Sequence, residues 1–329
     1  MTKKTIRILS VFAVFCLVFS TFLGVWASKF VSSFYFGEKI ELDSLDAENT
    51  SIGVVNILLL GVDEGGMRSD TIMLVSLNGK TKKINVLSIP RDTRVPFGSN
   101  HYKINSAIGI GAQEVAKGNL KQPEELTIQK VKMLTGMPVH YFMTVNFDGF
   151  KEIIDILGGV DFEVPFDMVY DDPAQNLHIN LKAGMQHLDG QKAHDFVRFR
   201  KGNAGHKGYA TGDLGRIEAQ QAFMRALAEQ KIKPQYLLKA TELFDSIKDN
   251  IRTNYSAADL IKHLGIIKNI TGEDIEMHQM PGTTSTIGGQ SYVICDEDAT
   301  AKLINTYFYP ESNSSSASSS SEKTKNTSK

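Results

Sequence analysis

Hydrophobic positions along the chain form short apolar runs separated by longer amphipathic stretches. The apolar runs are rich in β-branched residues and predict strands at 54–60, 71–77, 84–89, 141–146 and 160–164. Helical spacing and end signals predict helices at 103–117, 124–134, 150–157, 190–197, 214–230, 235–248 and 257–269. Because strands and helices interleave, the pattern predicts an α/β fold, a layered α-β-α domain with a central mixed sheet.

An uncharged apolar segment follows a short basic start. Lys3, Lys4 and Arg7 precede residues 8–28, which carry no charged side chain. About 20 helical residues at 1.5 Å each cover roughly 30 Å, the thickness of a bilayer core. We therefore expect a cytoplasmic segment at 1–7, a transmembrane signal anchor at 8–28 and an extracellular remainder, a single-pass protein of the cell membrane. A cleavable signal peptide is the alternative, although its apolar region would exceed the usual length of about 7–15 residues.

The exported part reads as one domain with polar ends. Residues 29–50 are mixed and polar and predict a spacer, and residues 311–329 are Ser-rich and predict a disordered tail. No composition break interrupts residues 51–310, which predicts one extracellular domain. If Cys16 lies in the membrane, Cys295 is the only cysteine outside, so the predicted core must hold the domain together without an intramolecular disulfide.

The overall charge weakens one class of partner. The chain carries 36 Lys and Arg against 37 Asp and Glu, a formal net charge of −1. Nucleic-acid-binding domains normally carry a basic excess, so we expect no nucleic-acid partner. In a chain this close to neutral, a local concentration of basic residues is informative.

Two carboxylates flank a glycine-rich stretch between the first two predicted strands. Asp63 follows the strand at 54–60, and Asp70 comes directly before the strand at 71–77. Carboxylates at facing strand ends can converge on a hard cation such as Mg²⁺, with water and phosphate oxygens completing its shell. The alternative is a hairpin loop in which these residues serve only turn geometry. The spacing leaves both interpretations open.

A second cluster follows the strand at 84–89. Arg91 lies just beyond this strand, and Lys103 lies at the start of the next predicted helix. Ligands of open α/β sheets bind beyond the carboxyl ends of strands, and a guanidinium there can bind a phosphate through two parallel hydrogen bonds. A structural contact between Arg91 and Asp92, or plain solvation of the loop, is the alternative.

A third cluster lies between the two central predicted helices. Arg198 and Arg200 would share a face if their segment were extended, since alternate strand residues do. Asp213, Arg216 and Gln220 are spaced i, i+3 and i+7 and would share one helix face. A surface ion-pair network is the alternative for either group. Three basic clusters, each beside an apolar element, together favour an anion-binding site.

At these positions the chain resembles the LytR–CpsA–Psr family of cell-wall polymer ligases. The resemblance rests on short motifs that occur in family order over roughly residues 54–230. They include Leu-Gly-Val-Asp at 60–63, Arg-Ser-Asp-Thr at 68–71, Ser-Ile-Pro-Arg-Asp-Thr at 88–93, Tyr-Lys-Ile-Asn-x-Ala at 102–107, Asn-Phe-Asp-Gly-Phe at 146–150, Leu-Gly-Gly-Val at 157–160, Leu-Asp-Gly at 188–190, Val-Arg-Phe-Arg at 197–200 and Gly-Asp-Leu-Gly-Arg at 212–216. The chain departs from the family pattern in a short loop at 63–70, a long segment at 200–213, and Ala219 where many members have an arginine.

The resemblance implies a phosphotransferase. Members of the family transfer an anionic glycopolymer, of the teichoic acid or capsular polysaccharide type, from an undecaprenyl-pyrophosphate carrier to peptidoglycan and form a phosphodiester. By position, Asp63 and Asp70 resemble the carboxylates of a Mg²⁺ site that Mn²⁺ can also occupy. The residues that resemble pyrophosphate ligands or their support are Arg91, Lys103, Arg198, Arg200, Asp213, Arg216 and Gln220; with the two carboxylates, Arg91, Arg198 and Arg200 would be catalytic.

Two further functions remain open at this point. One is a membrane-anchored regulator or wall-binding protein without catalysis. The other is a hydrolase of lipid pyrophosphates that uses the same basic cluster with water as the nucleophile. The reaction products would distinguish all three functions.

Overall fold

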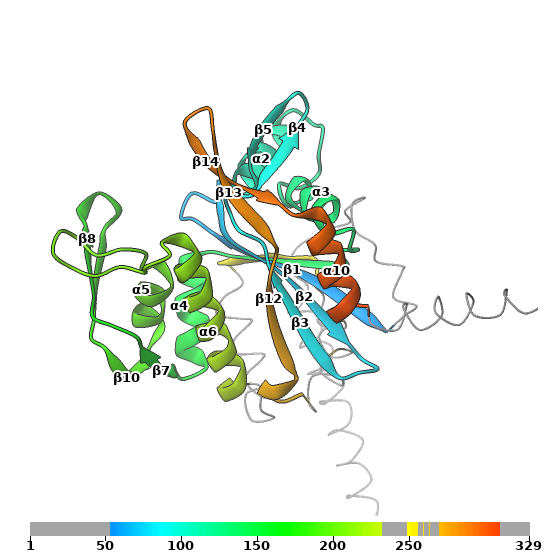
Figure 1. The fold of residues 1–329 in the computed structure, drawn as a ribbon. Coiled ribbons are helices and arrows are strands. Elements are labelled where there is room, and N and C mark those ends of the chain that lie inside the picture. Colours follow the sequence, from blue (N-terminus) through cyan, green and yellow to red (C-terminus); the bar gives the residue numbers. More distant parts are fainter. Residues whose placement is uncertain (1–52, 232–248, 256–258, 260–262, 264–269, 310–329) are drawn as a thin grey trace, which may run out of the picture.

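The computed structural model of the chain describes residues 53–231, 249–255, 259, 263 and 270–309. At its centre is a six-stranded sheet in the order β11-β6-β1-β2-β3-β12 (Figure 1). Its strands are β1 (Val54–Val62), β2 (Ser69–Asn78), β3 (Lys83–Ser88), β6 (Tyr141–Val145), β11 (Ile251–Thr253) and β12 (Ile275–Gln279). Strand β1 pairs antiparallel with β2 and parallel with β6, and β3 pairs parallel with β12. This pairing confirms the predicted central mixed sheet.

Helices cover both faces of the sheet. The helices are α2 (Ala107–Ala116), α3 (Glu124–Thr135), α4 (Phe147–Ile156), α5 (Gly190–Arg198), α6 (Asp213–Lys231) and α10 (Glu297–Tyr307). In Figure 1, α4, α5 and α6 lie on one side of the sheet, and α3 and α10 lie on the other. Successive strand residues point to opposite faces, so one strand supplies side chains to both layers.

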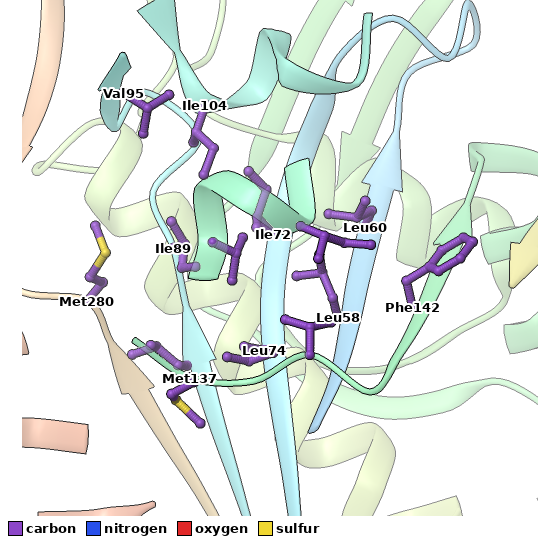
Figure 2. Packing of buried hydrophobic residues seen from close by; sticks show 14 of the residues in the cluster. Leu58, Leu60, Ile72, Leu74, Ile89, Val95, Ile104, Met137, Phe142 and Met280 are labelled. Carbon is purple, nitrogen blue, oxygen red and sulfur yellow. The ribbon is translucent and has the colours of Figure 1, made fainter. Parts of the chain in front are cut away.

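The larger core lies between the sheet and the layer of α2, α3 and α10. Leu58, Leu60 and Leu74 of the two central strands are almost fully buried and pack with apolar residues of these helices (Figure 2). On the opposite face, Val55 and Met73 belong to a second cluster, against which Met224 of α6 packs. Burial on both faces explains why β1 reads as a nearly continuous apolar run.

A third core joins α4, α5 and α6 to two hairpins. Strand β7 (Val160–Val164) pairs with β10 (Gly184–Leu188), and β8 (Met168–Asp172) pairs with β9 (Leu177–Leu181) through the short helix η3 (Pro173–Gln175). Phe196, Phe199 and Phe223 are buried at the centre of this cluster. The remaining elements are β4 (Arg94–Phe97), β5 (Asn100–Lys103), η2 (Ile104–Ser106), η4 (Gly272–Asp274), β13 (Gly282–Ile287) and β14 (Gln290–Cys295).

Several predicted boundaries need correction. The helix predicted at 103–117 begins only at Ala107, because Lys103 ends β5, where it pairs with Arg94. The helix predicted at 150–157 begins at Phe147, because the Asn146 side chain accepts a hydrogen bond from the Gly149 amide at 2.8 Å and caps the helix there. The sequence pattern did not predict the hairpins β4–β5, β8–β9 and β13–β14.

Some predictions fall outside the described residues. These are the transmembrane segment at 8–28, the spacer at 29–50, the helix at 235–248 and the tail at 311–329. Of the helix predicted at 257–269, the structure describes only Asp259 and His263. Within the described part of the chain, no helix has the length and apolar character needed to cross a bilayer.

Candidate functional site

A cavity of about 460 Å³ lies between the central sheet and helices α4 and α6. Most of its wall is apolar and comes from β1, β2, β6, α4 and α6. The apolar lining includes Leu59, Met73, Met143, Val145, Phe147, Phe150, Ile153, Met224 and Leu227. Its charged lining consists of Asp70, Arg91, Arg198, Arg200, Lys201 and Arg216. The cavity therefore combines an apolar body with a strongly basic set of side chains.

Asp70 and Arg91 form an ion pair at the edge of the sheet. Asp70 is the second residue of β2, inside the strand rather than before it as predicted. The Ile89 amide donates to the Ile72 carbonyl at 2.9 Å, so the chain leaving β3 still follows β2. This path brings Arg91 back to Asp70, and Arg91 Nη1 lies 2.8 Å from Asp70 Oδ1. The ion pair holds the guanidinium at the cavity wall.

Arg198 enters the cavity from the end of a helix. Helix α5 continues through Arg198, so the extended conformation considered for 197–200 is not adopted at this residue. The helix persists because Ala193 and Phe196, three positions apart on one face, are buried in the third core. Arg198 Nη2 donates to Gln175 Oε1 at 2.8 Å, and the guanidinium lies 4.7 Å from the centroid of the Phe147 ring. These contacts orient a planar cation toward the cavity.

Arg200 lines the cavity from the chain that leaves α5. Phe199 has extended backbone angles and is buried, which places Arg200 beyond the helix with an exposed side chain. Arg198 and Arg200 thus reach the same cavity, as predicted, but by a turn out of a helix and not by a shared strand face. Lys201, which follows directly, adds a further cation to the lining.

Helix α6 supplies Arg216 and Gln220. Arg216 is 8% exposed. The Gln220 side chain donates to the Val197 carbonyl at 2.8 Å and so ties α6 to the end of α5. A Cβ atom at Gly215 would lie 2.7 Å from Tyr209 Cβ, so glycine allows α6 to start this close to the preceding loop. Asp213 begins the helix, but its side chain lies outside the described atoms.

Two predicted site residues are engaged elsewhere. Asp63 Oδ1 accepts hydrogen bonds from the Met67 and Arg68 amides at 2.8 and 3.1 Å, which is the turn geometry of the alternative interpretation. Lys103 Nζ lies 3.0 Å from Asp92 Oδ1, whereas Arg91 pairs with Asp70. Neither Asp63 nor Lys103 is among the described residues that line the cavity.

The hairpin β8–β9 contributes lining residues that no motif marks. Tyr170 of β8 and Gln175 of η3 both line the cavity. The Tyr170 hydroxyl donates to Asp172 Oδ2 at 3.2 Å, and partial burial with the nearby Asp172 carboxylate raises the pKa of Tyr170, so the hydroxyl keeps its proton at neutral pH. Lys201 could have been found from the sequence, since it extends the basic cluster at 198–200.

The positions of the described carboxylates decide whether they could hold a divalent cation. The described part of the chain contains no group of three or more His, Cys, Asp and Glu side chains able to hold a metal. Mg²⁺, however, is commonly bound by one or two carboxylates together with water and substrate phosphates. Asp70 lines the cavity beside the basic residues, which is the position such a shared site requires. The donor set fits a cation that takes most of its ligands from a bound phosphate.

The cavity can receive an amphipathic anionic ligand. Four guanidinium groups and one ammonium group face one carboxylate, so the lining has a large excess of positive charge. Arginine forks match phosphate oxygens through paired hydrogen bonds. The apolar body accepts a hydrocarbon chain without leaving polar groups unsatisfied.

The chain is similar to known cell-wall proteins over this same region. A model of the LytR_cpsA_psr family matches residues 32–308. The polyisoprenyl-teichoic acid–peptidoglycan teichoic acid transferase TagU of Oceanobacillus iheyensis is 34% identical over 256 residues, which cover 74% of this chain and 72% of TagU. TagV of Bacillus subtilis, a transferase of the same description, is 28% identical over 255 residues, 74% of this chain and 61% of TagV, so the chain spans less than two thirds of that relative.

Solved structures show the same fold. The crystal structure of B. subtilis TagV matches with a TM-score of 0.61 and 27% identity, covering 78% of this chain and 97% of that one. A structure of TagT bound to LI-WTA matches with a TM-score of 0.61 and 25% identity, covering 83% of this chain and 96% of that one. The mixed sheet and the helices that cover it are therefore shared with these proteins.

Proposed function

The chain belongs to the LytR_cpsA_psr family, and we propose that it is a phosphotransferase that moves an anionic glycopolymer of the teichoic acid type from a polyisoprenyl-pyrophosphate carrier to peptidoglycan. The observation that carries this proposal is the cavity that joins apolar walls to Arg91, Arg198, Arg200 and Arg216. The relatives TagU and TagV are named as transferases of polyisoprenyl-linked teichoic acid to peptidoglycan. A lipid pyrophosphate has an apolar chain and an anionic head, which complement the apolar walls and the basic side chains of the cavity.

Each part of the donor has a counterpart in the cavity. The apolar side chains of α4, α6 and the sheet would bind the isoprenoid chain. The arginines would bind the pyrophosphate, and their charge would offset the repulsion that its oxygens exert on an attacking hydroxyl. The Arg91–Asp70 and Arg198–Gln175 contacts keep two of these arginines oriented before the donor arrives.

The transfer breaks the phosphoanhydride bond of the carrier and forms a phosphoester bond to the acceptor. A sugar hydroxyl of the acceptor attacks the phosphorus attached to the polymer, and the bond from this phosphorus to the bridging oxygen breaks. The carrier leaves as the polyisoprenyl monophosphate, and the hydroxyl proton passes to a base. Asp70, the one carboxylate among the described residues of the lining, would accept this proton. Asp70 would hold a Mg²⁺ or Mn²⁺ ion together with water and the phosphates of the donor, and the ion would supply further positive charge to these phosphates, while Asp63 would shape the loop before β2.

Product analysis tests the proposal directly. The full-length protein in detergent would be incubated with lipid-linked polymer and with peptidoglycan freed of teichoic acid. Polymer joined covalently to the glycan is the expected product. Free phosphorylated polymer would identify a hydrolase instead, and unchanged substrates would indicate a binding or regulatory protein.

A further inference from the structure

The tip of the hairpin β8–β9 lies against the end of α5. The hairpin is fixed there because Leu177 and Ile179 of β9 are buried in the third core together with Phe196 of α5. The turn between the two strands reaches the last residue of α5, where Gln175 Oε1 accepts a hydrogen bond from Arg198 Nη2 at 2.8 Å. A contact between distant segments thus joins the turn to the cavity.

The sequence of this turn, Asp-Pro-Ala-Gln-Asn, gives it a fixed shape. Asp172 Oδ1 accepts a hydrogen bond from the Ala174 amide at 3.1 Å and caps η3, whose first residue is Pro173. Proline fixes its own φ, and its missing N–H costs nothing at the first position of a helix. Asn176 ends the turn in the left-handed region, with φ of 46°, which asparagine tolerates better than most residues. These features hold Gln175 in one position relative to Asp172.

A carboxylate lies behind the Gln175 amide. Gln175 Nε2 donates to Asp172 Oδ2 at 2.6 Å, while Gln175 Oε1 accepts from Arg198. Chemistry allows only this orientation of the amide, because an ionised carboxylate accepts hydrogen bonds and a guanidinium donates them. The Tyr170 hydroxyl also donates to Asp172 Oδ2, at 3.2 Å. Asp172, Gln175 and Arg198 therefore form a chain in which each group fixes the next.

An aromatic ring holds the face of the same guanidinium. Arg198 lies 4.7 Å from the centroid of the Phe147 ring, and the ring of His194 packs against Phe147 with 5.0 Å between the centroids. A ring face attracts the cation but does not define how the guanidinium is turned above it. A hydrogen bond along one edge does so, because such a bond needs alignment of donor and acceptor. Gln175 thus decides which nitrogens of Arg198 face a ligand.

The charge of the cavity makes such support necessary. Four other cationic side chains line the same cavity as Arg198, and the described lining contains one carboxylate. Cations this close repel one another, and a long side chain relieves the repulsion by turning out into solvent. The ion pair with Asp70 holds Arg91 against this repulsion. Asp172 gives Arg198 a negative counter-charge through Gln175, which occupies one guanidinium nitrogen.

We propose that Asp172 is a positioning residue for the transfer reaction and acts on Arg198 through Gln175. The inference rests on the proposed function for the identity of the ligand, a pyrophosphate bound by the arginines. Asp172 holds the amide, and the amide keeps the guanidinium turned toward the pyrophosphate before the donor binds. Asp172 itself is not among the described residues that line the cavity, so its effect must pass through Gln175.

Binding of a soluble lipid pyrophosphate tests this chain of contacts without requiring transfer. The full-length protein in detergent would be titrated calorimetrically with farnesyl pyrophosphate, a pyrophosphate on a short isoprenoid chain. Gln175→Ala should raise the dissociation constant about tenfold, the usual worth of a hydrogen bond to a charged group. Asp172→Asn should raise it about threefold, because the charge is lost but an oxygen remains to accept from Gln175.

An exchange of the two groups gives a sharper test. Gln175→Glu alone sets two carboxylates within hydrogen-bond distance, and their repulsion should weaken binding about tenfold. In the double variant that combines Asp172→Asn with Gln175→Glu, the new amide can donate to the new carboxylate, which accepts from Arg198, and one negative charge remains. This double variant should bind within about threefold of the wild type.

Coupling to Arg198 separates a positioning role from a structural one. In a protein that already carries Arg198→Ala, Gln175→Ala should cause no further rise of the dissociation constant, because the amide has no guanidinium left to hold. A turn that only stabilised the fold would add the same loss in both backgrounds. The matched control is His178→Ala, which removes an exposed side chain of β9 that is not among the described lining residues and should bind like the wild type. Melting temperatures would show that all variants are folded.

The transfer assay adds a second readout. Gln175→Ala and Asp172→Asn should raise the KM of the lipid-linked donor and leave the KM of the acceptor unchanged. The inference would be overturned by wild-type affinity in Gln175→Ala, by an equal further loss in the Arg198→Ala background, or by a double variant that binds no better than Gln175→Glu. Failure of the wild type to bind farnesyl pyrophosphate would also overturn it, whereas the transfer product would still decide the proposed function. If binding changes as expected but no product forms, Asp172 still positions Arg198 for a pyrophosphate and the proposed reaction fails.

Discussion

The arginines of the cavity differ in how the protein holds them, although their chemistry is the same. Arg216 is almost completely buried, and Arg198 is fixed by Gln175 and Phe147. Arg200 is exposed at the end of the extended turn out of α5. Burial and fixed contacts make the first two part of the folded scaffold. Because the Arg200 side chain is exposed, its removal should affect folding less than removal of the buried Arg216 and should report on catalysis.

Substitution of Arg200 tests the phosphate-binding role. Arg200→Lys keeps the charge but loses the paired hydrogen bonds, and Arg200→Ala loses both. One preorganised donor at developing charge contributes roughly 10²–10³ in rate, so Arg200→Ala should lose about this factor in kcat and Arg200→Lys a large part of it. Turnover of lipid-linked donor and melting temperature would be measured together.

The melting temperature should change little in both variants, because loss of one exposed cation relieves repulsion within the cluster. An ordinary surface ion pair is worth about 0–1 kcal/mol. Near wild-type turnover in Arg200→Ala would therefore mean that this side chain belongs to the surface and not to the site.

The carboxylates give a second test at the level of single residues. Asp70→Asn keeps an oxygen that can accept from Arg91 but removes the charge that a cation or a proton transfer needs. Turnover should fall by about 10² or more, and excess chelator should abolish wild-type activity until Mg²⁺ or Mn²⁺ is restored. Asp148→Asn, at an exposed carboxylate paired with Lys151, is the matched control. Full activity in excess chelator would remove the metal assignment for Asp70.

At the scale of elements, the close contact between the start of α6 and the loop before it sets the position of Arg216. Gly215→Ala would place a methyl group 2.7 Å from Tyr209 Cβ and 2.8 Å from Thr211 Oγ1, so the helix or the loop must shift. We expect a stability loss of about 1–3 kcal/mol together with lower turnover. Thermal unfolding and transfer assays would measure both effects. Gly65→Ala, whose added methyl would meet only Met67 Cγ at 3.9 Å, should keep the melting temperature of the wild type.

The docking of α10 on the sheet should depend on pH through His278. This residue of β12 packs against the rings of Tyr307 and Phe308, and burial lowers its pKa below the ordinary value of 6.5, with partial opposition from Glu276. Between the lowered pKa and 6.5, the unfolded chain binds a proton that the folded chain does not. Stability contributed by neutral His278 is therefore present above about pH 6.5 and is lost as the pH falls toward the folded pKa.

Melting curves at pH 7.5 and pH 5.5 would measure this effect. The wild type should lose more stability on acidification than His278→Asn, which has no titrating ring. An equal loss in the two proteins would show that other groups cause the acid dependence.

For the whole molecule, the main prediction concerns membrane topology. The basic residues Lys3, Lys4 and Arg7 followed by the uncharged run at 8–28 predict an anchor with the catalytic part outside the cell. The protein should sediment with membranes, and a C-terminal tag should be cleaved by protease added to intact, wall-stripped cells. A tag that stays protected in such cells, but is cleaved after lysis, would contradict the topology.

What the sequence by itself determined about this protein is local in origin. Short apolar runs rich in β-branched residues placed β7 at its observed bounds and the other four predicted strands within a few residues, because burial of a strand depends on that local pattern. The motifs also identified Arg91, Arg198, Arg200 and Arg216 as one basic set, since they rest on residue type and order along the chain. The family could be named from the same motifs.

The tertiary structure alone decided which groups meet. Asp63 turns its carboxylate to its own loop, and Lys103 pairs with Asp92, although both look like ligands in the sequence. Tyr170 and Gln175 enter the cavity only because β8 and β9 pair and fold back over α5. A side chain chooses its partner by distance in the folded state, and pairing between distant strands sets that distance. No pattern within one segment contains this information, so the cavity lining became visible only in the folded molecule.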